Sequence, residues 1–223
     1  MRFGRLPHDP VALAAAHKHV LGVSLPQTVL DRGAIPFQPG LDGNDIYGDC
    51  TCVSIANAIR ARAVLNGFQA NVSSTAAVTF FATCAGHPSD LVAVDGLVYL
   101  DVINRQASEG FPTGFDTLFG IPGTVDPSRA SLADAIGRFG SVGVGVTLHQ
   151  SDLAAFQAGA VWDDGSGDVA GGHVMLAWDY TGLGDTDTVR VATWGQLIRV
   201  TWRWLERAAD EAHALDFPQE TAA

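Results

Sequence analysis

A glycine-rich loop that ends at a cysteine is the stretch of this sequence best suited to chemistry. Residues 43–52 have the sequence GNDIYGDCTC and run directly into an apolar pattern that is typical of a helix. The apolar positions form one stripe: Cys52, Ile55, Ala56, Ile59 and Ala63. Cys50 lies roughly 200° around such a helix from Cys52, at about 100° per residue. The pattern therefore predicts that Cys52 faces the core and that Cys50 faces outward, toward a cleft at the start of the helix.

Cys50 is a candidate nucleophile because of this position. A thiol at the first turn of a helix lies beside unpaired backbone N–H groups and the positive end of the helix dipole, and both favour the thiolate. Asn44, six residues earlier, lies on a loop that could fold back and offer its amide to a developing oxyanion. The alternative interpretation is that Cys50 is a small buried residue and that Asn44 is a turn residue.

His173 is the candidate base for this thiol. It follows Gly171 and Gly172 at the start of a predicted strand, where the small residues leave room around the imidazole ring. The alternative is a histidine at a strand edge that hydrogen-bonds to the backbone. A cysteine at a helix start combined with a distant histidine after two glycines favours the catalytic interpretation.

The elements that must position these residues divide into a helical first half and a strand-rich second half. Helical patterns are predicted from residue 52 to about 67 and at 74–84, 97–107 and 127–139, the last capped by Asp126 or, with a later start, by Ser131. Strands are predicted at 141–148, 172–179, 188–195, 197–201 and 211–217, with short helices near 152–158 and 202–209. This order predicts an α+β fold with an antiparallel sheet, and a cleft between the halves that has Cys50 on one wall.

Length and composition indicate one globular unit. The 223 residues, 47% hydrophobic and 17% charged, suffice for one large core. We expect an N-terminal arm at residues 1–40 that packs on the domain, the domain itself at 41–217 and a tail at 218–223. Thirteen basic and 24 acidic residues give a formal charge of −11, which argues against nucleic acid and anionic membranes as partners.

Membrane insertion and secretion are not predicted either. No apolar run approaches the ~18 residues of a membrane-spanning helix, and the N-terminus lacks the hydrophobic stretch of a signal peptide. We therefore expect synthesis in the cytoplasm.

The cysteines and histidines outside the candidate pair predict no further chemistry. Cys50 and Cys52 are too close for an easy disulfide, and Cys84 lies on the apolar side of a predicted helix. His17 and His19 are a conceivable metal pair, but they point to different sides of a helix and no third ligand is nearby. We expect no metal and no cofactor.

This arrangement resembles the papain-like cysteine peptidases. In that family a helix carries the nucleophilic cysteine, an amide residue six positions earlier completes the oxyanion hole, and the sheet half supplies the histidine. Asn44 stands six positions before Cys50, and Tyr180 follows His173 by seven positions, as in the family pattern. The resemblance implies acyl transfer in which Cys50 attacks an amide carbonyl and His173 carries the proton.

The segment Thr193-Trp194-Gly195 resembles the family's Asn-Ser-Trp-Gly, in which asparagine orients the histidine and tryptophan shields it. Matching Trp194 to that tryptophan places Ala192 at the position of the asparagine. The orienting residue is therefore missing or replaced, with Thr193 and Asp179 as the two alternatives.

A closer resemblance is to papain-like proteins of bacteriophages and prophages, also described as bacteriocin-leader-peptidase-like, and it extends from about residue 7 to 217. They share a Gly-Asn-Asp-x-Tyr-Gly-Asp-Cys loop, a Gly-Gly-His strand and a Thr-Trp-Gly strand with this chain. The resemblance implies a peptide or a peptidoglycan stem amide as substrate. It also implies an alternative role as a noncatalytic virion or binding module whose partners are other virion proteins.

Overall fold

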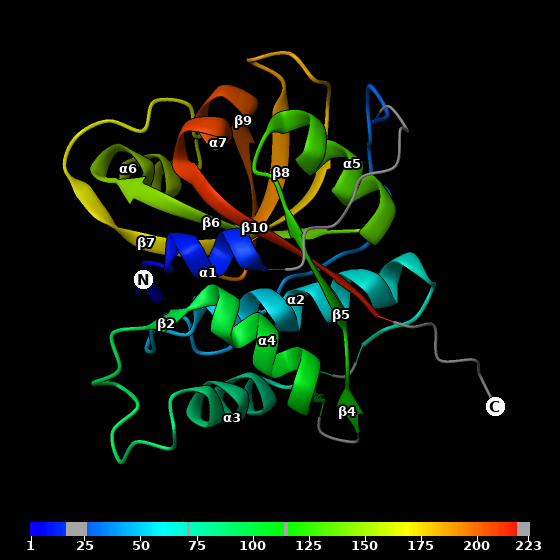
Figure 1. Cartoon of the computed structure of the whole chain (residues 1–223). Helices are drawn as coiled ribbons and strands as arrows, with labels where there is room; N and C mark the ends of the chain where they lie inside the picture. The colour runs from blue at the N-terminus through cyan, green and yellow to red at the C-terminus, as the bar shows by residue number, and fades with distance from the viewer. Residues whose placement is uncertain (17–25, 71, 114–115, 218–223) are drawn as a thin grey trace.

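A six-stranded antiparallel sheet lies between two groups of helices (Figure 1). The computed structural model describes residues 1–16, 26–70, 72–113 and 116–217. His17, His19 and the predicted tail lie outside the described residues. Within the described part of the chain, no helix is long and apolar enough to cross a membrane.

The strand order of the sheet is β5-β10-β6-β7-β8-β9. Every neighbouring pair is antiparallel, as the sequence predicted. The bounds are β5 (Ile121–Val125), β6 (Val142–His149), β7 (Val169–Tyr180), β8 (Thr188–Thr193), β9 (Gln196–Thr201) and β10 (Ala209–Asp216). The strand β7 is the longest and carries His173 near the middle of the sheet.

The helices cover both faces of this sheet. One face carries α2 (Cys50–Leu65), α3 (Ser74–Cys84) and α4 (Tyr99–Glu109), and the other carries α5 (Arg129–Phe139), α6 (Gln150–Ala158) and α7 (Trp202–Ala208). A short helix, α1 (Pro10–Ala15), begins after Asp9, whose side chain accepts a hydrogen bond from Val11 N–H. These helices agree with the predicted ones to within a few residues.

The start of α5 differs from both predicted caps. Ser128 is the N-cap residue, and the helix begins at Arg129. Asp126 instead accepts a hydrogen bond from the backbone N–H of Ser128, 2.9 Å away. This hydrogen bond closes a side-chain turn over residues 126–128, just before the helix begins, and Asp126 is therefore not the N-cap residue.

Five strands were not predicted from the sequence. Four have only two residues: β1 (Arg5–Leu6), β2 (Leu97–Val98), β3 (Phe111–Pro112) and β4 (Thr117–Leu118). The fifth, β5, contains Pro122 and Gly123, which are poor strand formers, and it is tolerated because it lies at the edge of the sheet. Because β2 precedes α4 directly, that helix starts two residues later than predicted.

The core has two parts that meet at the sheet. Alternating residues of β7 face opposite sides, so Val174 and Leu176 pack with α2 while Met175 and Ala177 pack with the other helices. The helix α2 is buried nearly all round, which is typical of a central core helix and differs from the single apolar stripe predicted. Its first residue, Cys50, is buried as well, so the prediction that it faces outward is wrong, for a reason described with the site below.

Candidate active site

The imidazole of His173 is held between two residues of the neighbouring strand end. Its Nε2 lies 2.8 Å from the Thr193 hydroxyl oxygen, and its ring stacks on the Trp194 indole at 4.3 Å and 19°. Its Nδ1 has no hydrogen-bond partner. One ring nitrogen is thus fixed and the other is available, which is the arrangement that a general base requires.

The backbone at Trp194 explains how this arrangement forms. The strand β8 ends at Thr193, and Trp194 follows in the turn to β9 with a φ of 43°. A left-handed conformation is unusual for a bulky residue and costs conformational energy. Trp194 adopts it where its ring covers His173, so this strained turn places both Thr193 and the indole against the imidazole.

Asp179, the other predicted orienting residue, does not contact His173. Its carboxylate accepts hydrogen bonds from the Arg190 guanidinium and from the backbone N–H of Arg32. Ala192 is buried opposite Leu176 in the core shared with α2. Thr193 therefore occupies the place beside Nε2 that the resemblance assigns to an asparagine.

On the opposite wall, Cys50 is the first residue of α2 and is 1% exposed. Asn44 lies in the preceding loop, but its side-chain amide donates to Asp49 Oδ1, 3.1 Å away. Asp49 is fully buried, and its second oxygen has no hydrogen-bond partner. Burial raises the pKa of Asp49 to about 7, although the hydrogen bond from Asn44 acts in the opposite direction.

Asp49 is a residue whose importance the sequence reasoning missed. A carboxylate directly before a cysteine at the start of a buried helix was the available signal. It bears on the thiol because its charge lies close to the sulfur and disfavours the thiolate.

Burial disfavours the charged forms of both Cys50 and His173. Burial raises the pKa of Cys50 to about 12 and Asp49 adds to the rise, while backbone hydrogen bonds from Val174 and Gly4 to the sulfur lower it. Burial also lowers the pKa of His173 to about 3, with a further contribution from the charge of Arg5. The expected stabilisation of the thiolate by the helix start is therefore outweighed by burial in this state. The Val174 contact nevertheless places the sulfur at the residue next to His173.

An N-terminal strap, residues 3–6, causes this burial. Leu97 N–H donates to the Gly4 carbonyl at 2.8 Å, and β1 pairs with β2 in parallel. A Cβ added at Gly4 would overlap the carbonyl group of Gly48, and one at Gly172 would lie 2.5 Å from the Arg5 carbonyl oxygen. The strap thus passes between the two walls and over Cys50. The glycine before His173 leaves room for this backbone, in addition to any room that it leaves around the imidazole.

The strap and the neighbouring Arg2 also contact Trp194, which covers the candidate base His173. The Trp194 indole N–H donates to the Arg2 carbonyl at 3.3 Å, and the Phe3 ring meets the indole edge-on at 6.3 Å. The described N-terminal residues therefore touch the cysteine wall and the histidine wall together.

One group of side chains within the described residues has the composition of a metal site. One ligand atom each from His8, Asp210 and Glu211 lies within 4.8 Å of the others. However, the guanidinium of Arg5 bonds both carboxylates at 2.8–2.9 Å. A cation of the chain itself therefore occupies this group, which does not fit a metal.

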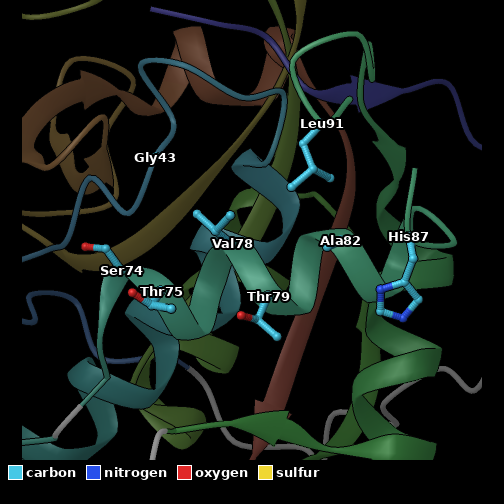
Figure 2. A pocket seen from close by; sticks show the side chains of 8 residues that line it. All are labelled: Gly43, Ser74, Thr75, Val78, Thr79, Ala82, His87 and Leu91. Atoms are coloured by element: carbon cyan, nitrogen blue, oxygen red, sulfur yellow. The ribbon is translucent and has the colours of Figure 1, made fainter. Parts of the chain in front are cut away.

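A surface pocket of about 410 Å³ lies apart from the Cys–His pair, along α3 (Figure 2). It is lined by Gly43, Ser74, Thr75, Val78, Thr79, Ala82, His87 and Leu91. The only residue of the candidate loop that it reaches is Gly43, and it contains no candidate nucleophile or base.

Comparison with known proteins gives likeness in structure only. No family model matches the chain, and no curated protein matches its sequence. The cysteine protease xylellain from Xylella fastidiosa superposes with a TM-score of 0.60 at 15% identity, over 96% of this chain and 91% of that one. The procathepsin B S9 of Trypanosoma congolense superposes with a TM-score of 0.68 at 13% sequence identity, over 98% of this chain and 87% of that one. Digestive procathepsin L 3 of Tenebrio molitor superposes with a TM-score of 0.54 at 16% sequence identity, over 92% of this chain and 77% of that one. These likenesses show that the chain has the fold of the papain-like cysteine proteases.

Proposed function

We propose that this protein is a cysteine peptidase in which Cys50 is the nucleophile and His173 the general base. The observation that carries the proposal is the environment of the imidazole, which has one nitrogen fixed by Thr193, a face covered by Trp194 and a second nitrogen without a partner. A structural histidine gains nothing from an unpartnered buried nitrogen, because such a group is costly to desolvate.

The proposed reaction is acyl transfer to Cys50. A hydrogen bond from Nε2–H to the Thr193 oxygen leaves the lone pair on Nδ1, which takes the thiol proton as the sulfur attacks the carbonyl carbon. The protonated imidazole then gives that proton to the leaving amine as the amide C–N bond breaks. Water, deprotonated by the same nitrogen, hydrolyses the thioester and regenerates the thiol.

Asn44 and the backbone N–H of Cys50 are the proposed oxyanion donors. The Asn44 amide is bound to Asp49 in this structure, so it must turn toward the substrate or share its two N–H donors between the carboxyl group and the oxyanion. Asp49 thereby becomes the residue that sets the orientation of this amide.

A peptide is the proposed substrate. The edge at β2 already accepts an extended backbone, since Leu97 N–H bonds Gly4 of the strap. An extended substrate that displaced the strap would find the same hydrogen-bond donor. A peptidoglycan stem amide is the other candidate substrate.

A second candidate function is that of a noncatalytic module, which in a virion would bind other virion proteins. The filled cleft favours it, because the strap covers Cys50 and the pKa of the thiol is raised to about 12. Ala192 at the position of the usual asparagine is consistent with it as well.

The experiment that separates the two functions is the pH dependence of Cys50 alkylation by iodoacetamide in the folded protein, with His173→Ala measured in parallel. Mass spectrometry of the digested protein reports Cys50 separately from Cys52 and Cys84. The wild-type chain and an Arg5→Ala variant, in which the strap is loosened, are each tested, together with hydrolysis of quenched fluorescent peptides.

For a peptidase we expect that the loosened chain has a Cys50 thiolate titrating well below the ordinary value of ~8.5. His173→Ala should return the pKa toward that value, and Cys50→Ala should abolish hydrolysis. An unreactive thiol in both chains, unaffected by His173→Ala and accompanied by no hydrolysis, would establish the noncatalytic module instead.

A further inference from the structure

The side chain of Arg5 fills an acidic pocket next to the proposed catalytic pair. Its guanidinium donates to Glu211 Oε1 at 2.9 Å and to Asp210 Oδ2 at 2.8 Å, and it is 4% exposed. We call the surroundings of this group the acidic pocket, which comprises Gly145, Asp210, Glu211 and His213.

The acidic pocket is built around a fully buried carboxylate. Glu211 is paired on its other oxygen with the His213 ring nitrogen at 3.2 Å, and His8 Nδ1 lies 3.7 Å from Oε1. Burial alone would raise the pKa of Glu211, but the hydrogen bonds and charges of His213 and Arg5 lower it on balance. Glu211 is therefore an ionised group in the interior.

Gly145 of β6 makes the room for the cation. A Cβ at this position would lie 2.5 Å from Glu211 Cγ and 3.0 Å from Arg5 Cδ. Any larger residue would push against both side chains. The space therefore fits a long, unbranched, cationic side chain whose stem passes beside Gly145.

Two consecutive residues of the strap connect the acidic pocket with the proposed nucleophile. The backbone of Gly4 hydrogen-bonds the Cys50 sulfur, and the next residue is Arg5. The charge of Arg5 is close enough to lower the pKa of both Cys50 and His173. An extended peptide lying in place of the strap would bring one of its side chains to the same pocket.

We propose that the acidic pocket is the specificity site of this peptidase, that it selects substrates with an arginine or lysine side chain, and that Arg5 is the chain's own occupant of it. This inference rests on the proposed function. The physical reason is that a buried carboxylate left without its cation is strongly disfavoured. A substrate that displaces the strap must therefore supply a cation in place of Arg5, and an uncharged side chain cannot do so.

The first test uses the side-chain analogue alone. In the full-length Arg5→Ala chain, n-propylguanidinium at millimolar concentration should raise the melting temperature, whereas its uncharged isostere n-propylurea should not. The wild type, whose pocket is occupied, should not respond, nor should Arg5→Ala combined with Glu211→Gln. Equal effects of the cation and the urea on Arg5→Ala would overturn the inference.

The second test uses labelled extended peptides that differ only in arginine against citrulline, with the position moved along the sequence. Fluorescence anisotropy measures their binding to the full-length Arg5→Ala chain that also carries Cys50→Ala. We expect at least about a tenfold preference for arginine at one position, because a hydrogen bond to a charged group is worth more than one between neutral groups. Glu211→Gln should remove the preference, whereas Asp216→Asn on the same strand should leave it.

Turnover of the same peptides by the chain with an intact Cys50 separates the two proposals. A binding preference for arginine without any hydrolysis would contradict the proposed peptidase function. It would still support the acidic pocket as a binding site for arginine or lysine side chains. Hydrolysis without any preference for arginine over citrulline would leave the peptidase standing and overturn the acidic pocket as its specificity site.

Discussion

The two walls of the cleft differ in how far their groups are arranged for catalysis. On the histidine wall, His173 already has its partner Thr193 and its cover Trp194. On the cysteine wall, the Asn44 amide is bound to Asp49, and the Cys50 sulfur is bound by the backbone of the strap. The proposed base is therefore preorganised, while the proposed nucleophile and its proposed oxyanion donor are occupied.

This difference follows from how each wall is built. His173 and Thr193 belong to neighbouring antiparallel strands, so the sheet itself brings them together. Asn44 and Asp49 belong to a single loop that leads into a buried helix, where a carboxylate finds few partners besides the nearest amide. Activation of the proposed site requires changes on the cysteine wall, and the following substitutions probe both walls.

His173→Ala should have the largest effect. Loss of a general base costs about 10²–10⁴-fold in rate, so kcat/KM for peptide hydrolysis should fall by that factor while the fold is retained. The control is His149→Ala, since His149 is a partly exposed residue at the end of β6 whose nearest carboxylate is Asp152. Equal losses from the two variants would mean that His173 is not the base.

Asp49→Asn should change the pH dependence of stability. The pKa of the folded Asp49 is raised from the ordinary 3.8 to about 7, so the folded state retains a proton that the unfolded state releases. The free energy of unfolding of the wild type should therefore fall as the pH rises from 3.8 to about 7, by about 4 kcal/mol in total. Below pH 3.8 Asp49 is protonated in both the folded and the unfolded state, so it causes no further change of the free energy of unfolding with pH.

Urea unfolding at several pH values measures this fall, and Asp49→Asn should remove it. The matched control is Asp45→Asn, because Asp45 is exposed in the same loop and its charge makes the smallest of the contributions to the raised pKa of Asp49, so most of the fall should remain. Asp49→Asn should also shift Cys50 alkylation to lower pH, since a charge that raises the pKa of the thiol is gone. A wild-type profile that stays flat through this window would show that Asp49 does not hold the proton.

Thr193→Val should have an intermediate effect, of about tenfold in kcat, because it keeps the shape of the side chain but leaves Nε2 of His173 unpaired. Thr193→Ser, which retains the hydroxyl, should recover most of the loss. A purely structural role of Thr193 would lower stability in the valine variant without moving the pH profile of kcat. The pH profile is therefore the decisive measurement, and KM should change little.

Much of the fold could be predicted from the sequence because periodicity reports local structure. The apolar spacing located α3 at its observed bounds, and the strand alternation located β6 to within one residue. The two-residue strands β1 and β2 could not be predicted, because a pair of that length has no period and exists only through contact between distant segments.

The candidate site shows the same limit. Residue type and spacing led to Cys50, His173 and Asn44, and left Thr193 and Asp179 as alternatives, which only the three-dimensional contacts separate. Burial of Cys50 could not be predicted, because it depends on residues 3–6, more than 40 positions away. The same long-range contact reverses the expected electrostatics of the thiol.

Cys52→Ala should have the smallest effect and tests the difference between two cysteines of one helix turn. Cys52 is completely buried among apolar residues, so its truncation should lower the free energy of unfolding by about 1 kcal/mol through a small cavity. Peptide hydrolysis per folded molecule and the alkylation of Cys50 should stay at wild-type levels, because the Cys52 sulfur interacts with Thr51 and Cys84 and not with the histidine wall. Cys50→Ala should cost a similar ~1 kcal/mol of stability, because Cys50 is buried as well, but it should abolish hydrolysis completely. If both substitutions reduced hydrolysis per folded molecule equally, the assignment of Cys50 as the nucleophile would have to be abandoned.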